Sequence, residues 1–499
     1  MEAHANIVIE RIRRRVNMGH EKRDACVVRH VTRMMSAPGA GAGQAAGSKE
    51  AAWAESKSWY DLVNNPKVTI DRLRELRAGV VLEGIDPSAC VAVLHDITEL
   101  DFTRHASMHR RKEIGDYHGL GFEYHPCLAW DPVARRFLGV LHDTLISADG
   151  PDDAGAVDYG NDPALASLNE DERRALPFNH RHQLVTHIRH LAALAPDLRL
   201  THVADREFDD IPAMTAAYET HSDFVFRVLG NRTVLAGGDG GGAKTSMEEL
   251  TAALPMRHYK EIGLDARGHA AYGGAKPKRV ARLSIGACGV SLYRPYTRGN
   301  HKNIKLKAPV PVNLVVIREL EPPPKTDPLC WLLFTSLPTD TKEQRAWAGA
   351  LYEQRWRIEE YFKLLKSDGF RVEYTHFTGP EQVAKILVFY SLAAMALLTM
   401  KLELGLPATG PLDPDNYEKV RHAMRHPDDP DLDPLMRLFA LAVRCGGWMG
   451  RRTDPIGPRT LMRGMLQLMS TFALVNQFPD LIQALASAYG GDGKNAYTW

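Results

Sequence analysis

Short apolar runs that end in an acid are the feature that most constrains the fold of this chain. Cys90–Asp96 reads CVAVLHD, Leu198–Asp205 reads LRLTHVAD, and Arg136–His142 is a third run of similar length. Runs this short, with a helical stretch at 211–221, favour strands of an α/β fold. Open α/β sheets place their functional groups at the carboxyl ends of their strands. The pattern therefore predicts an α/β core with both acids at one edge of its sheet.

The composition and hydrophobic pattern on either side of these runs predict three domains. Residues 5–35 read as helical and basic, a Gly/Ala-rich segment follows at 38–47, and a second helical stretch ends near Pro66. Gly-, Pro- and Val-rich alternating runs then fill about 224–335, and helical patterns resume at Lys342. The predicted domains are a helical N-terminal domain at 1–70, a catalytic domain at 71–405 with a β-rich insertion at about 228–335, and a helical C-terminal domain at 406–499.

Length and composition agree with a soluble multidomain protein. The 499 residues exceed what one compact core accommodates, and 44% apolar with 25% charged residues is ordinary for globular proteins. The net charge of +1 means that any nucleic-acid binding depends on local basic surfaces. The six cysteines show no CxxC spacing, which suits a reducing cytoplasm. The apolar run 386–400 is shorter than the roughly 20 residues that span a bilayer, so we expect a buried helix and no membrane association.

One stripe of polar side chains carries most of the chemical information. Its members follow the pattern Y-x2-R-x3-E-x6-K and are Tyr352, Arg355, Glu359, Lys363 and Lys366. Residues three and four apart share one face of a helix, so the pattern predicts one face with a single carboxylate among cations. Such a face can hold a metal ion beside a phosphate backbone. The alternative is a solvated helix face with ordinary ion pairs.

Asp96, Asp205 and Glu359 together form a candidate metal-binding triad. Hard divalent cations such as Mg²⁺ prefer carboxylate oxygens, and two ions held by such acids can drive an in-line phosphoryl displacement. The alternative for a lone acid at a strand end is a turn or helix-capping role. Asp101 and Asp209 are nearby acids that compete for the same assignment.

The segments around the three acids resemble those of bacterial insertion-sequence DDE transposases of the Y-R-E-K type, the insertion-sequence-four group. The resemblance covers nearly the whole chain. The acid segments are Leu94–Phe102, Val203–Asp209 and Tyr352–Glu360; further resembling segments are Ser58–Val68, Phe224–Arg227, Trp331–Pro338 and Gly446–Gly457.

This resemblance implies an RNase H-like catalytic core with a β-rich insertion between the second Asp and the Glu, flanked by a DNA-binding and a dimerisation domain. The implied reaction is cut-and-paste transposition, in which water nicks the transposon end, the freed 3′-OH forms a hairpin, the hairpin opens, and the 3′-OH attacks target DNA. The implied cofactor is Mg²⁺, two ions per site, with Mn²⁺ as a substitute and no small-molecule cofactor. The implied partners are double-stranded DNA, as terminal inverted repeats and target, and a second copy in a synaptic dimer. Such a protein works in the bacterial cytoplasm, at the nucleoid.

The same resemblance assigns DNA contacts. Arg355 and Lys366 would grip phosphates, Tyr352 would hydrogen-bond a phosphate, Lys363 would contact DNA, and Trp331 would stack on a base turned out of the duplex. The remaining implied contacts are Arg227 in the core and Lys22 and Arg23 in the N-terminal domain. The alternatives are a core tryptophan on a strand, a structural ion pair for Arg227, and a solvated helix face for the N-terminal basic residues.

Two departures and two competing functions accompany the resemblance. Ser36–Gly39 stands where the family carries a basic-aromatic pair, and Cys26 stands where an arginine is expected, so the recognised end sequence is not predicted. One competing function is a non-catalytic DNA-binding or dimerising protein, such as an inhibitor that starts at Met18 or Met34. The other is a host nuclease with an RNase H-like core. The complete triad disfavours the first, and the helical region after about residue 405 disfavours the second.

Overall fold

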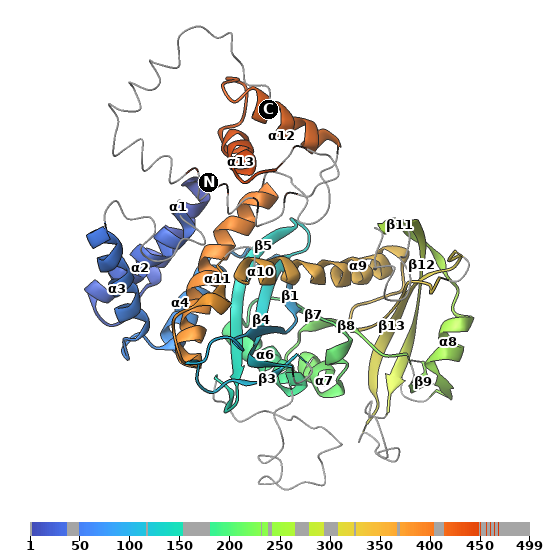
Figure 1. The fold of residues 1–499 in the computed structure, drawn as a ribbon. Helices are drawn as coiled ribbons and strands as arrows, with labels where there is room; N and C mark the ends of the chain where they lie inside the picture. Colours follow the sequence, from blue (N-terminus) through green and yellow to red (C-terminus); the bar gives the residue numbers. More distant parts are fainter. Residues whose placement is uncertain are drawn as a thin grey trace.

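A computed structural model gives the fold of most of the chain (Figure 1). The described residues are 2–36, 49–115, 118–152, 180–230, 232–237, 242–264, 279–293, 308–323, 326–366, 370–403, 414–448 and the single positions 450, 456, 460, 464 and 468. In Figure 1 the helices of the N-terminal part lie on one side of the sheet, and the β-rich segment lies on the other.

Five strands form the centre of the sheet in the order β5-β4-β1-β7-β8. β1 runs parallel to β7 and β7 parallel to β8, while β4 is antiparallel to both β1 and β5. Their bounds are β1 Val91–His95, β4 Gly119–Asp131, β5 Arg136–Ser147, β7 Leu200–Ala204 and β8 Asp223–Arg227. The mixed α/β architecture is confirmed, and it is consistent with a nuclease-like core.

The β-rich segment after β8 extends this same sheet. β14 pairs antiparallel with β8, and the order continues through β13, β12, β9 and β10, with β11 on β12. The bounds of these strands are β9 Thr233–Ala236, β10 Lys244–Ser246, β11 Arg257–Leu264, β12 Arg279–Leu292, β13 Val310–Glu319 and β14 Cys330–Thr335. Three short strands complete the sheet: β2 Thr98–Asp101 and β3 Lys112–Ile114 pair with β4, and β6 Gly150–Pro151 pairs with β5.

Helices lie against both the central strands and the extension. α4 Ile70–Leu82 precedes the first strand, and the helices between strands are α6 His180–Leu194, α7 Ile211–Glu219 and α8 Met247–Ala253. Those that follow the last strand are α9 Lys342–Glu353, α10 Arg357–Leu365 and α11 Pro380–Glu403. α9 begins where it does because Thr341 and Gln344 form a capping box that satisfies two otherwise unpaired amide groups.

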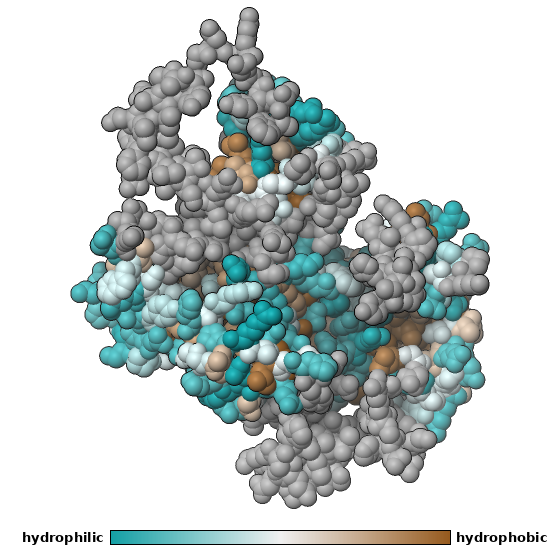
Figure 2. Space-filling view, viewed as in Figure 1, coloured by the Kyte–Doolittle hydropathy of each residue, from teal (hydrophilic) through white to brown (hydrophobic). Residues whose placement is uncertain are grey.

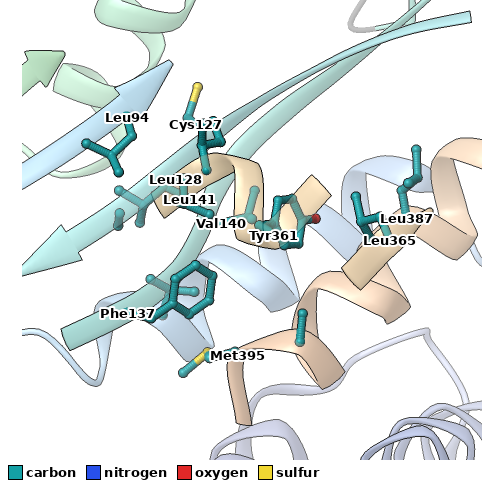
Figure 3. Packing of buried hydrophobic residues seen from close by; sticks show 14 of the residues in the cluster. Leu94, Cys127, Leu128, Phe137, Val140, Leu141, Tyr361, Leu365, Leu387 and Met395 are labelled. Atoms are coloured by element: carbon teal, nitrogen blue, oxygen red, sulfur yellow. The ribbon is translucent and has the colours of Figure 1, made fainter. Parts of the chain in front are cut away.

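The apolar core lies between the antiparallel strands and the helices α4, α10 and α11. Figure 3 shows Tyr361 of α10 beside Val140 of β5, and Leu365 of α10 beside Leu387 of α11. α11 contains the apolar run 386–400, and its described positions are largely buried, as the sequence predicts. Of the helices that fall within the described ranges, none has the length and apolar character needed to cross a bilayer. Figure 2 shows that hydrophilic side chains cover most of the visible described surface.

The N-terminal helices share this core rather than forming one of their own. α1 Glu2–Arg15, α2 Glu21–Ser36 and α3 Lys49–Val63 contribute buried residues to the apolar cluster that also contains β1 and α11. Trp59 of α3 packs edge-on against Phe389 of α11, with ring centroids 4.9 Å apart. The predicted boundary near residue 70 therefore crosses a continuous apolar cluster.

Several of the N-terminal arginines form ion pairs within the protein. Arg14 and Arg15 bind Glu83, and Arg33 binds Glu55 at 3.0 Å. These arginines therefore have acidic partners within the protein itself.

Two helices beyond residue 405 form a separate small cluster. α12 Pro414–Arg425 and α13 Pro434–Cys445 pack through buried apolar residues that include Phe439 and Trp448. Most of the segment after Trp448 that resembles dimer contacts lies outside the described residues.

Gly139 allows α4 and α11 to pack closely against β5. Its φ of +133° lies in a region that L side chains rarely adopt, and an added Cβ would lie 2.5 Å from a Val81 side-chain atom. We expect Gly139→Ala to lower the free energy of unfolding by about 2 kcal/mol or more, through strain and overpacking. Urea denaturation measures the loss. Gly263→Ala is the control, because its Cβ would meet nothing within 4 Å; equal effects of the two changes would contradict the prediction.

Candidate active site

The two strand-end acids lie side by side, as the sequence predicts. Asp96 directly follows β1 and Asp205 directly follows β7, and the pairing of Leu94 with Val203 aligns the two parallel strands. Asp205 also caps a short 3-10 turn, η2 Arg206–Phe208, by accepting a hydrogen bond from the Arg206 amide at 2.7 Å. The capping role and a role in the site therefore coexist in one residue.

Arg355 joins these acids to the third. Its guanidinium donates a hydrogen bond to Asp96 at 2.6 Å, and lies 3.5 Å from Asp205 and 3.9 Å from Glu359. The Arg355 side chain is only 5% exposed, so these contacts are formed with little competition from water. All three predicted acids therefore converge on one cation that the chain itself supplies.

The single helix predicted for the Y-R-E-K residues is interrupted, although Tyr352, Arg355 and Glu359 still face one group of acids. α9 ends at Glu353, a 3-10 turn η4 spans Gln354–Trp356, and α10 runs over Arg357–Leu365. Lys366 follows the end of α10 with non-helical dihedral angles. A 3-10 turn advances three residues per turn and changes the direction of side chains relative to an α-helix. Here the turn contains Arg355, whose contact with Asp96 reaches across to the sheet.

Tyr352 and Arg227 complete the acid cluster on its β8 side. The Tyr352 hydroxyl donates a hydrogen bond to Asp205 at 3.2 Å, and Arg227 donates one to the Tyr352 hydroxyl at 3.3 Å. Arg227 also lies 3.5 Å from Asp205. β8 neighbours β7 in the sheet, which explains how its last residue reaches this acid.

Trp331 lies next to this group on β14. Its ring centroid is 5.8 Å from that of Tyr352, and its side chain is half-buried. The position satisfies the alternative of a strand tryptophan that packs on the core, and it also places an aromatic face at the border of the acid cluster.

The two lysines of the stripe are less closely tied to the acids. Lys363 is exposed on α10. The Lys366 ammonium lies 3.9 Å from Glu373, and burial lowers the pKa of Lys366. In the N-terminal part, Lys22 is exposed and Arg23 half-buried on α2, a helix that packs against α1, α3 and α11.

A fourth acid, Glu207 of η2, belongs to the cluster and is not predicted from the sequence. Burial, together with repulsion from Asp96, raises the pKa of Glu207 to about 7, so the protonated carboxyl can donate a hydrogen bond to Asp96. Burial also raises the pKa of Asp96 and of Glu359. The only sequence signal for Glu207 is its place in the acid-rich segment Asp205–Asp210. Periodicity does not show which acids of that segment belong to the site.

The two competing acids have other partners. Asp209 accepts hydrogen bonds from the Leu229 amide at 2.9 Å and from Arg232. Asp101 accepts one from the Thr103 amide at 2.8 Å. These three hydrogen bonds are structural contacts with residues outside the group around Arg355, which favours Asp96 and Asp205 as the functional pair.

The donor set suits a hard divalent cation. Carboxylates are the ligands that Mg²⁺ prefers, and burial of several acids together raises the free energy of their charged forms, which a cation would lower. Within the described ranges, the acids are spread around the Arg355 guanidinium and do not form a compact group with ligand atoms within 4.8 Å of one another. A bound ion would therefore share or take over the position of that guanidinium.

Residues 179–396 match the family model described as the transposase DDE domain. The matched segment contains Asp205, Arg355 and Glu359, whereas Asp96 precedes it. The structure brings Asp96 to the matched residues through the parallel pairing of β1 with β7. The match supports a DDE transposase, an enzyme that cleaves DNA and transfers strands.

Proposed function

We propose that this chain is a cut-and-paste DNA transposase of the Y-R-E-K type, built on an RNase H-like core. The observation that carries the proposal is the convergence of Asp96, Asp205 and Glu359 from three separate elements on Arg355, within a chain that matches the transposase DDE domain. The strand arrangement supports the RNase H-like core. In chain order, the antiparallel strands β1, β4 and β5 are followed by β7 and β8, which run parallel to β1, and an acid follows both β1 and β7.

The three acids would hold two Mg²⁺ ions, with Mn²⁺ as a substitute. By the resemblance to the family, Asp96 would contribute to both ions, and Asp205 and Glu359 would each contribute to one. When bound, such ions lower the pKa of a water nucleophile and neutralise the leaving 3′ oxygen. A single set of acids would then serve nicking, hairpin formation, hairpin opening and strand transfer in turn.

Arg355 would change partners when DNA and metal arrive. In the structure its guanidinium neutralises the acids. Cations bound to the same carboxylates would weaken those contacts, and the guanidinium would then be available to grip a phosphate in the bidentate geometry that Arg favours. Tyr352 would exchange its hydrogen bond to Asp205 for one to a phosphate oxygen, and Lys363 and Lys366 would add point charges along the same strand.

The proposed DNA partners are terminal inverted repeats and a target duplex. Lys22 and Arg23 on α2 would contact phosphates near the end, and Arg227 would contact DNA beside Asp205. A second copy of the chain would complete the synaptic complex. A non-catalytic DNA-binding protein has no need for a group of neighbouring carboxylates with raised pKa values, so it is the weaker candidate.

The test uses purified protein and a labelled DNA fragment that carries the inverted repeats flanking this gene, with and without Mg²⁺. We expect metal-dependent nicking, followed by hairpin and blunt ends, and loss of all three products in Asp96→Ala. Binding without cleavage, in Mg²⁺ and in Mn²⁺ alike, would replace this function with the non-catalytic one. Cleavage that never yields a hairpin would favour a simple nuclease.

Trp331→Ala tests the role of the aromatic face beside the acids. We expect hairpin formation to slow about 5- to 100-fold while the first nick keeps its rate, because base stacking contributes about 1–3 kcal/mol and matters only once a base has left the duplex. Single-turnover assays on intact and pre-nicked ends separate the two steps. Trp53→Ala is the control, since Trp53 is 67% exposed on α3. Equal slowing of both steps would assign Trp331 to the core instead.

A further inference from the structure

A cluster of buried histidines lies beside the acid site but takes no part in it. His95 ends β1, His125 lies on β4 and His187 on α6, and each side chain is essentially inaccessible to solvent. One ring nitrogen from each of the three lies within 4.8 Å of those from the other two. His202 of β7 borders the group and is also buried.

The hydrogen bonds of this cluster leave ring nitrogens aimed into the protein interior. His95 uses Nε2 in a 2.9 Å bond to Nδ1 of His202, and His187 uses Nε2 in a 2.7 Å bond to the Thr144 hydroxyl. The Nδ1 atoms of His95 and His187 are both buried, and neither has a hydrogen-bond partner. An unpaired buried polar atom costs about 1–3 kcal/mol, so two of them in one cluster require an explanation.

A bound metal ion would explain the unpaired ring nitrogens. Histidine ligands of metals characteristically bind with one nitrogen and hydrogen-bond through the other, which fixes the ring and its tautomer. His95 and His187 have this arrangement, with His202 and Thr144 as the outer partners. The Thr144 hydroxyl is itself held by Gln183 at 3.0 Å.

We propose that His95, His125 and His187 form a site for one transition-metal cation of the Zn²⁺ class, separate from the carboxylate site. Imidazole nitrogens select such borderline cations over Mg²⁺, which prefers oxygen. A tetrahedral ion with bonds of about 2.0–2.1 Å needs its ligand nitrogens roughly 3.4 Å apart, and the three present nitrogens lie within 4.8 Å of one another.

The location indicates what the ion does. Phe208, which is fully buried, lies beside His125 with ring centroids 5.2 Å apart. The ligands join α6 to two neighbouring strands, and His95 is the residue immediately before Asp96. An ion here would fix the end of β1 and, with it, the position of the first acid. The role is structural support of the site and does not depend on which DNA reaction the acids perform.

The test measures zinc in wild-type protein prepared without a polyhistidine tag. The protein is loaded with Zn²⁺ in excess Mg²⁺, which occupies the carboxylates, and is then passed through gel filtration. We expect one zinc per chain by mass spectrometry, an X-ray absorption spectrum with imidazole scattering, and the visible bands of tetrahedral Co²⁺ after exchange. No retained zinc and no cobalt bands would overturn the proposal.

Variants locate the ion. His187→Gln should weaken zinc binding about tenfold or more, and should abolish the rise in melting temperature that zinc produces. His190→Gln is the matched control, because His190 is exposed one turn further along α6. This substitution should change neither zinc binding nor the rise in melting temperature. If His187→Gln does not fold, His202→Gln removes only an outer partner and should weaken binding about 10- to 100-fold. Zinc retained unchanged in all of these folded variants would place the ion elsewhere and overturn the proposal.

Discussion

Glu359→Gln is expected to abolish DNA cleavage while leaving end binding within about twofold of wild type. The substitution keeps the shape of the side chain and removes the charge that would hold a cation. Loss of about 4 kcal/mol of transition-state stabilisation corresponds to a fall of roughly a thousandfold in rate. Single-turnover nicking in Mg²⁺ measures the rate, and gel-shift titration measures binding.

Glu359 is the best of the three acids for this experiment because its removal disturbs the fold least. Its side chain is 37% exposed and its contact with Arg355 is long, at 3.9 Å, whereas Asp96 is tightly bonded to the same guanidinium. Glu343→Gln is the matched control, an exposed glutamate on α9. Cleavage by Glu359→Gln at a rate near that of the wild type would remove Glu359 from the triad. Loss of binding together with cleavage would show that this acid supports the DNA-binding surface.

Asp143→Asn is expected to lower the free energy of unfolding by about 3–5 kcal/mol, the cost of leaving a buried cation without its counter-charge. Asp143 accepts hydrogen bonds from Arg77 at 2.6 and 3.0 Å, from Arg74 at 2.8 Å and from the Tyr124 hydroxyl at 2.9 Å. Arg77 is 1% exposed, so water cannot replace the lost partner. Urea denaturation near neutral pH gives the difference directly.

The control for this change is an exposed pair of the same type. Asp149 contacts Arg110 at 3.2 Å, and both side chains are largely open to solvent, so Asp149→Asn should cost about 0–1 kcal/mol. The two arginines hold the pKa of Asp143 far below its ordinary value of 3.8, against the opposing effect of burial. Its contribution to stability is therefore complete above that value and is lost as the pH falls below it. Similar losses for Asp143→Asn and Asp149→Asn would show that the buried network is not what stabilises α4 on the sheet.

Local patterns predict the parts of the site that lie at strand ends. Asp96 and Asp205 can be predicted because each follows a short apolar run, and an apolar run of four to eight residues indicates a buried strand. The convergence with Glu359 depends on the parallel pairing of β1 and β7 across more than 100 residues, which periodicity does not encode. The resemblance to a family, and not the local pattern, carries that part of the prediction.

The departures have local physical causes. Helical spacing predicts one continuous face for Tyr352 to Lys366, but tertiary contacts of Arg355 with the sheet accompany a 3-10 turn that periodicity does not reveal. β4 also escapes prediction, because Pro126 and Gly121 interrupt its pattern and most of its later residues are buried on both faces. The histidine cluster cannot be predicted from local patterns either, because its members come from β1, β4 and α6, which are distant in the sequence.

The continuous apolar cluster that joins α1–α3 to the catalytic strands has a geometric consequence. If α2 contacts the DNA end and the acids cut it, the distance between the recognised base pairs and the broken bond is set by packing such as that of Trp59 against Phe389. The protein would then act as a ruler of fixed length. Inserting base pairs between the recognised sequence and the transposon end should shift the cut by the same number of base pairs, away from the end.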